Sequence, residues 1–144
     1  MKLHLFDSSK KIPEQCNILI GFPSVGNVGQ LAMDSILSTL GPHAQRIGCI
    51  ESDHVLPMSG YDRMFPTAPI QLCLPVEVYL STSADTSFVV ILQRCPVIQS
   101  KLKVYTEELF DLLTSWQSNV IIVLTGASLN PYENATSLHT LSEK

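Results

Sequence analysis

The chain has 144 residues, enough for one domain with a hydrophobic core that needs neither disulfides nor a structural metal. Its formal net charge of −4 argues against nucleic acid binding, which relies on clustered lysines and arginines. Only 15% of its residues are Asp, Glu, Lys or Arg, against roughly 25% in soluble domains. Such a charge-poor surface is typical of a subunit with a large partner-facing patch, although a surface rich in Ser, Thr, Gln and Pro gives the same composition.

The first recognisable element is an apolar run over residues 16–22, which predicts a strand buried on both faces. Residues 27–40 then follow a helical period, which Gly41 and Pro42 end. A strand pattern resumes at residues 46–50, so this part of the chain predicts a parallel strand, helix, strand crossover unit. The stripe that we expect the helix to bury consists of Val28, Leu31, Ala32, Ile36 and Leu40, and the opposite stripe holds Gln30, Asp34 and Ser38.

The middle of the chain, residues 51–69, keeps no period and contains three prolines and a glycine, which predicts a functional loop or a short hairpin. Strand patterns follow at 70–74, 76–80 and 86–93, and the polar residues between the last two favour an antiparallel hairpin. A second helix is predicted over residues 100–116, with Leu102, Tyr105, Leu109, Leu112, Leu113 and Trp116 on one side. Residues 119–125 predict the last strand.

This order of elements predicts one α/β domain over residues 1–144, with a mixed β-sheet flanked by helices. The four cysteines are far apart beside apolar runs, so we interpret them as small core residues. No N-terminal stretch has the form of a signal peptide, and no apolar run is long enough to span a membrane. We therefore expect a cytoplasmic protein with no membrane partner, and the nucleus stays open as a second location.

The loop at residues 21–29, Gly-Phe-Pro-Ser-Val-Gly-Asn-Val-Gly, joins a predicted strand to a predicted helix, where glycines can bring N–H groups to a phosphate. It lacks the Lys and Ser or Thr of a P-loop, and no Gly-x-Gly-x-x-Gly can be drawn. We favour the interpretation that its glycines let the helix start pack closely on the strand or on a partner, and we expect Gly29→Leu to weaken dimerisation while mostly sparing the fold. The candidate partner-binding residues are Val25, Gly26, Asn27, Val28, Gly29 and Gln30.

The other polar residues do not assemble a catalytic or metal site in the sequence. Ser24 is not in a Gly-x-Ser-x-Gly motif, so we expect it to cap the helix that follows. None of the four histidines has a partner at metal-ligand spacing. Glu77 lies in an apolar run, and we expect strand alternation to turn it toward solvent. We predict no catalytic residue, no cofactor and no metal.

Residues 21–34 resemble the most recognisable segment of the proteasome assembly chaperone family, with Ser-Val-Gly-Asn-Val-Gly-Gln-Leu-Ala as the core of the match. Later segments follow in the order of that family, so the resemblance extends from about residue 16 to about residue 132. It implies a non-enzymatic chaperone that forms a heterodimer with proteasome assembly chaperone 1. It also implies that this heterodimer holds the α-subunits of the 20S proteasome while their ring forms.

The fold that the resemblance implies is an α/β sandwich related to nucleoside phosphorylases and hydrolases, without their catalytic residues. Family members are longer, and related chaperones end in a hydrophobic-Tyr-X tail, whereas this chain ends in Ser-Glu-Lys. We therefore expect a shortened form in which docking through such a tail is in doubt.

Two other functions stay open, a nucleoside phosphorylase or hydrolase-like enzyme and a plain nucleotide-binding module. Both are suggested by the strand-to-helix glycine turns at Gly26 and Gly126. Both need residues that bind phosphate or ribose, and we find no such group in the sequence.

Overall fold

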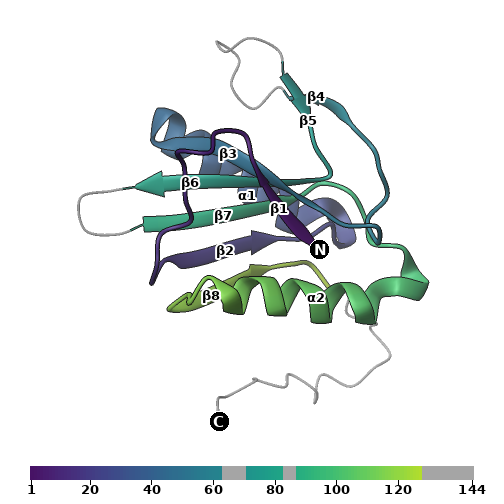
Figure 1. The fold of residues 1–144 in the computed structure, drawn as a ribbon. Helices are drawn as coiled ribbons and strands as arrows, with labels where there is room; N and C mark the ends of the chain where they lie inside the picture. Colours follow the sequence, from purple (N-terminus) through teal and green to yellow (C-terminus); the bar gives the residue numbers. More distant parts are fainter. Residues whose placement is uncertain (63–70, 83–86, 128–144) are drawn as a thin grey trace, which may run out of the picture.

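The computed structural model describes residues 1–62, 71–82 and 87–127, which form a six-stranded sheet with a helix on each face and a small separate hairpin (Figure 1). The predicted α/β class is confirmed. The strands of the sheet are β1 (Lys2–Leu5), β2 (Asn17–Gly21), β3 (Ala44–Glu51), β6 (Val76–Thr82), β7 (Ser87–Gln93) and β8 (Val120–Leu124). The helices are α1 (Val28–Leu40) and α2 (Leu102–Ser115), with short 3-10 turns at Val25–Asn27, Gly41–His43 and Gln99–Lys101. The separate hairpin consists of β4 (Gly60–Asp62) and β5 (Gln71–Cys73).

The strands of the main sheet lie in the order β1-β3-β6-β7-β2-β8. β2 runs parallel to β7 and β8, while β1, β3, β6 and β7 pair antiparallel in succession. The predicted antiparallel hairpin is therefore confirmed as β6 and β7. β3 has the direction of β2, as the predicted crossover unit requires, but β6 and β7 lie between them. This hairpin, formed by later residues, separates two strands that are neighbours in the sequence.

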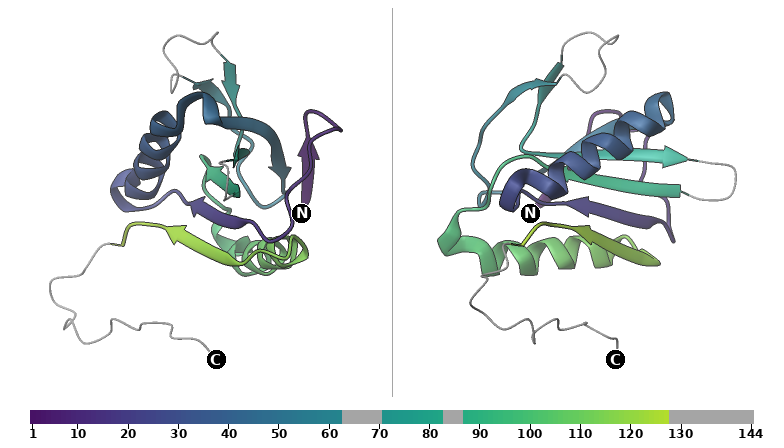
Figure 2. Two further views of the ribbon diagram at one scale, coloured as in Figure 1. Left: turned by 90° about the vertical axis from the view of Figure 1, so that its left-hand side faces the viewer. Right: turned by 180° about the vertical axis from the view of Figure 1, so that it is seen from behind.

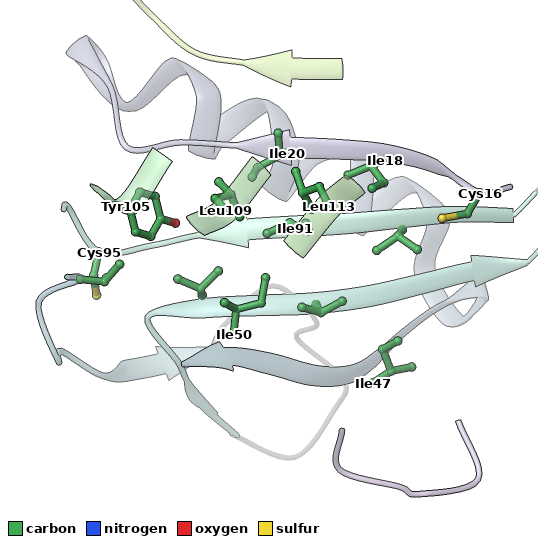
Figure 3. Packing of buried hydrophobic residues seen from close by; sticks show 14 residues of the cluster. Cys16, Ile18, Ile20, Ile47, Ile50, Ile91, Cys95, Tyr105, Leu109 and Leu113 are labelled. Carbon is green, nitrogen blue, oxygen red and sulfur yellow. The ribbon is translucent and has the colours of Figure 1, made fainter. Parts of the chain in front are cut away.

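Two cores cover the two faces of the sheet, and the end-on view in Figure 2 shows α1 and α2 on opposite sides. On the α2 side, Tyr105, Leu109 and Leu113 pack over Ile18, Ile20 and Ile91 of the strands (Figure 3). Cys16 and Cys95 belong to the same core, in agreement with their interpretation as small core residues. On the α1 side, Met33 and Leu37 pack over Tyr79, Val90 and Leu92.

The predicted orientation of α1 is wrong at the start of the helix, whereas Ile36 and Leu40 of the expected stripe do pack against the core. The helix buries Gly29, Met33 and Leu37, whereas Val28 and Leu31 of the expected apolar stripe are exposed. The physical reason lies at Gly29, where a Cβ atom would stand only 2.6 Å from the carbonyl oxygen of Leu124 and 2.7 Å from that of Phe22. The missing side chain lets the helix backbone lie directly on the ends of β8 and β2, and this contact turns the glycine side of the helix toward the sheet.

The expectation that Glu77 faces solvent is also wrong, because its side chain is completely buried. Arg46 Nη1 donates to Oε1 at 2.6 Å and Arg94 Nε donates to Oε2 at 3.0 Å. The backbone N–H of Leu74 and the hydroxyl of Tyr79 supply further hydrogen bonds, each at 3.2 Å. A buried carboxylate is stable only when opposite charges and donors surround it, and here two guanidinium groups do so.

A β-bulge in β3 brings Arg46 to this carboxylate. Arg46 lies opposite Tyr79, and Cys49 lies opposite Glu77, so three steps along β3 correspond to two along β6. The extra residue keeps Arg46 on the same face as Glu77, although simple alternation would separate them. The aromatic ring of Phe6 lies 5.6 Å from the Arg46 guanidinium carbon.

The remaining predicted elements match the structure closely, apart from their ends. The predicted loop at residues 51–69 contains β4, whose pairing with β5 agrees with the short-hairpin alternative. Parts of several predictions lie outside the described residues, namely 63–70, 83–86 and everything after residue 127. Neither described helix has the length and apolar composition that crossing a lipid bilayer requires.

Candidate partner-binding surface

The segment between β2 and α1 is an ordered turn with two residues in the left-handed conformation. Gly26 has a φ of 67° and Asn27 a φ of 54°. The N–H of Asn27 donates to the carbonyl oxygen of Ser24 at 2.9 Å, and the N–H of Gly29 donates to Ser24 Oγ at 3.3 Å. Ser24 Oγ therefore accepts a hydrogen bond from one of the open N–H groups at the start of α1, but the N-cap position of this helix is Asn27, and Ser24 is the N-cap residue of the preceding 3-10 turn.

This turn brings three large apolar side chains to the surface. Val25 is 60% exposed, Val28 is 56% exposed, and Leu31, one turn further along α1, is 60% exposed. We call these three residues the N-terminal patch. Gly126, which follows β8, packs directly against this turn. A Cβ atom at Gly126 would lie only 2.8 Å from the carbonyl oxygen of Val25. The patch thus stands on a backbone that is packed against the sheet.

The structure divides the six predicted partner-binding residues. Val25, Gly26, Asn27 and Val28 are exposed, Gln30 is half-buried, and Gly29 is buried against the strands. Because the close neighbours of Gly29 are atoms of its own chain, the expectation that Gly29→Leu spares the fold is wrong. The helical period places Leu31 in the buried stripe, but Leu31 is exposed and belongs to the same surface as Val25 and Val28.

The outward face of α1 beyond the patch carries no charge. Asp34 is the only charged residue of the helix, and its Oδ1 lies 3.3 Å from Arg94 Nη2. The hydroxyls of Ser35 and Thr39 donate to the carbonyl oxygens of Leu31 and Ser35 at 2.9 and 2.8 Å, so they are partly satisfied within the helix. A helix face without charges next to exposed Val and Leu is suited to burial against another protein, since charged residues are depleted where interfaces form.

A chain of charges connects α1 to the sheet beneath it. Arg94 contacts Asp34 of α1 and also the buried Glu77 of β6, which in turn binds Arg46 of β3. Burial on its own lowers the pKa of Arg94, but the hydrogen bond to Glu77 and the charges of Asp34 and Glu77 raise it above its ordinary value. The guanidinium therefore stays charged, and the network fixes the helix that carries the N-terminal patch.

The opposite side of the same loop borders a cavity of 450 Å³ between α2 and the strands. β2 leads into α1 on one face and the adjacent parallel β7 leads into α2 on the other, so this is a topological switch point, where α/β proteins commonly bind ligands. Its described lining is mostly apolar and contains no charged side chain. Tyr105 donates to Gln93 Oε1 at 2.6 Å, and burial raises the pKa of this tyrosine, which keeps its hydroxyl protonated.

This geometry does not favour a phosphate site in the glycine loop. The space beside Gly21 is filled by the side chain of Met33, and the space beside Gly29 by two carbonyl groups. Carbonyl oxygens repel an anion, and the cavity next to the loop supplies no cation. In the part of the chain that the structure describes, no group of three His, Cys, Asp or Glu side chains could hold a metal ion.

Comparisons with known proteins agree on one family. The model described as "PAC2 family" matches residues 18–141. Proteins named proteasome assembly chaperone 2 are similar to this chain, with 36% identity over 98 residues in Danio rerio and 36% over 113 residues in Homo sapiens. These matches cover 67% and 76% of this chain but only 35% and 41% of the relatives, so the chain spans well under half of their length.

Solved structures show the same fold at low sequence identity. Pyrococcus furiosus PbaB, an archaeal proteasome activator, superposes with a TM-score of 0.64 at 15% identity, over 89% of this chain and 52% of that one. Pyrococcus furiosus PbaA, an archaeal homolog of proteasome-assembly chaperone, gives a TM-score of 0.63 at 17% identity, over 92% and 52% of the two chains. At these identities the likeness concerns the fold alone.

Proposed function

The chain belongs to the PAC2 family, and we propose that it acts as a non-catalytic subunit of a proteasome assembly chaperone. The relatives that carry this function in their name match most of this chain. The finer proposal is a heterodimer with proteasome assembly chaperone 1 that holds the α-subunits of the 20S proteasome while their ring forms. We further propose that this takes place in the cytoplasm, with the nucleus as a second location.

One observation supports this function most directly, the N-terminal patch on an uncharged helix face. Val25, Val28 and Leu31 each expose more than half of their surface, and the turn and the charge network beneath them hold them in place. Exposed apolar groups on an ordered backbone lose little conformational freedom on binding, so they suit a stable protein interface. A chaperone subunit needs such a surface and needs no reactive side chain.

The test is a co-purification in which this chain is expressed with proteasome assembly chaperone 1 and, separately, with free α-subunits. We expect capture of both, and we expect Val28→Asp to weaken capture of the partner that the patch contacts by at least about tenfold, because a charge would be buried there. Val104→Asp is the matched control, since Val104 is also an exposed helical valine, on α2.

Circular dichroism should show that both variants keep the helical content of the unchanged chain. Equal binding by Val28→Asp and the unchanged chain would remove the patch from the proposal. A folded chain that captures neither the second chaperone nor any α-subunit would contradict the function itself.

A further inference from the structure

The hairpin of β4 and β5 stands away from the main sheet (Figure 1). None of its side chains that the structure describes belongs to either core. Tyr61 and Leu72 lie directly opposite each other, and they are 73% and 57% exposed. A two-stranded hairpin without a buried face is only marginally stable by itself, so contacts at its base must fix its position. Before β4, the N–H of Leu56 donates to the carbonyl oxygen of Pro96 at 3.1 Å.

On the β5 side, two charged residues of the main sheet supply the contacts. Arg46 Nη1 donates to the carbonyl oxygen of Leu72 at 2.9 Å and to Glu77 Oε1 at 2.6 Å. The N–H of Leu74, which follows β5, donates to the same Glu77 oxygen at 3.2 Å. Hydrogen bonds that involve an ionised group are roughly twice as strong as those between neutral groups. On this side the hairpin is therefore fixed by an arginine and a carboxylate.

The same carboxylate is also connected to α1. Arg94 Nε donates to Glu77 Oε2 at 3.0 Å, while Arg94 Nη2 lies 3.3 Å from Asp34 Oδ1. The arginine uses two different nitrogens and so holds both carboxylates at the same time. Asp34 lies three residues after Leu31 and is therefore its neighbour on the surface of α1. The network thus begins beside the N-terminal patch and ends at β5.

Burial makes the contacts at Glu77 depend on one another. Its side chain is completely buried, and the side chains of Arg46 and Arg94 are largely buried. A hydrogen bond that is lost at such a site is not simply replaced by one to water. Because both guanidinium groups bind one carboxylate, a shift of either changes the hydrogen bonds that the carboxylate can make with the other.

We propose that Glu77 couples the hairpin strand β5 to α1, so that fixing or loosening either element has the same effect on the other. Coupling between two sites is reciprocal, so the effect runs in both directions. A protein bound at the N-terminal patch would then also fix β5 and its exposed Leu72. The coupling acts within one chain and is measured without a partner, so it goes beyond the proposed function and does not depend on it.

The test is amide hydrogen exchange of the whole chain, followed residue by residue with NMR spectroscopy. Asp34→Asn keeps the shape of the side chain and changes only the α1 end of the network. We expect the protected amides of β5 to exchange at least about fivefold faster, which is the lower end of typical coupling between sites. Arg46→Lys, at the other end, should accelerate exchange in α1, because lysine lacks the rigid guanidinium that reaches Leu72 and Glu77 together. Asp111→Asn, the same change at an exposed position of α2, should leave β5 unaffected.

A further variant removes the connection itself. Arg94→Lys keeps a positive charge but has one side-chain nitrogen in place of three, so it should loosen both β5 and α1. Adding Asp34→Asn to it should accelerate β5 exchange no further, because the connection is already broken. Exchange in α2 should stay the same in every variant, which separates coupling from a general loss of stability. The proposal is overturned if Asp34→Asn accelerates exchange in α1 alone, if α2 changes as much as β5, or if the two effects multiply in the double variant.

Discussion

The two helices differ in their outward faces, although they cover opposite sides of one sheet and each buries three residues. The fourteen residues of α2 include Lys103, Glu107, Glu108 and Asp111, whereas the thirteen residues of α1 include Asp34 as their only charge. The charged residues of α2 identify the side of the helix that faces solvent. On α1 the single charge contacts Arg94. The N-terminal patch and the uncharged turns that follow it along the helix therefore form a surface suited to contact with another protein.

The attachment of the helices differs as well. α2 is held by large apolar side chains and by the hydrogen bond from Tyr105 to Gln93. α1 also has buried apolar side chains, but in addition its backbone touches the strand ends at Gly29 and a charge network reaches it through Asp34. Apolar packing tolerates small changes in shape, but a buried charge and a missing Cβ do not. We therefore expect single substitutions to affect the α1 side more strongly.

The largest expected effect is that of Glu77→Ala, which removes the centre of the network. Arg46 and Arg94 would remain mostly buried without their shared carboxylate, and breaking such a pair costs about 3–5 kcal/mol of the free energy of unfolding. Urea denaturation measures the loss. Glu77→Gln, which keeps the shape of the side chain, should lose less.

The matched control is Glu51→Ala. Glu51 Oε2 contacts His4 Nε2 at 2.6 Å, which is as short as the contact between Arg46 and Glu77, but both side chains are exposed. Exposed pairs contribute about 0–1 kcal/mol because water screens them. If the two substitutions destabilise the protein equally, burial of the network is not what makes it important.

The next largest effect is expected for Gly29→Ala, which tests the backbone contact of α1. The added methyl would meet two carbonyl oxygens within 2.7 Å, and overpacking of this kind costs about 1–3 kcal/mol. Gly60→Ala is the control, because the nearest atom to its added methyl is Cys73 Sγ at 3.8 Å, an ordinary contact distance. Thermal denaturation that shifts equally in both variants would contradict the close packing of Gly29.

The same contrast explains what the sequence could and could not predict. Most of the buried side of α2 follows from its sequence, since its charged residues exclude the opposite side and Tyr105, Leu109 and Leu113 of the predicted stripe are buried. Leu102 of that stripe is instead 56% exposed. In α1 both Val28 with Leu31 and Met33 with Leu37 are apolar, so the period alone cannot select the buried side. The selection is made by the contact of Gly29 with Leu124, a residue distant in sequence.

The candidate surface was partly predictable for a related reason. A strand-to-helix loop with several glycines identified residues 25–30, and four of these six are exposed. The supporting network was not predictable, because alternation treats Glu77 as a surface residue. Its partners come from β3 and from the end of β7, and the bulge that aligns Arg46 breaks the alternation on which the prediction relied.

The smallest expected effect concerns the charged face of α2 and depends on pH. Glu108 accepts a hydrogen bond from the N-terminal amine at 3.0 Å and lies 3.3 Å from His54 Nε2, and these contacts lower its pKa below the ordinary value of 4.5. A carboxyl group whose pKa is lower in the folded than in the unfolded state contributes its full stabilisation at pH values above the unfolded pKa. This stabilisation is lost as the pH falls through the folded pKa. Glu108→Gln should therefore melt slightly below the unchanged chain at about pH 6, and the two should converge at about pH 3.

The control for this prediction lies one residue earlier on the same helix. Glu107 is more exposed, and its contact with Lys103 is 3.9 Å long, so Glu107→Gln should follow the unchanged chain at both pH values. A constant difference for Glu108→Gln across the range would show that the carboxyl acts by its shape and not by its charge. In that case the outward face of α2 would have no electrostatic role in stability, and only its solvation would distinguish it from α1.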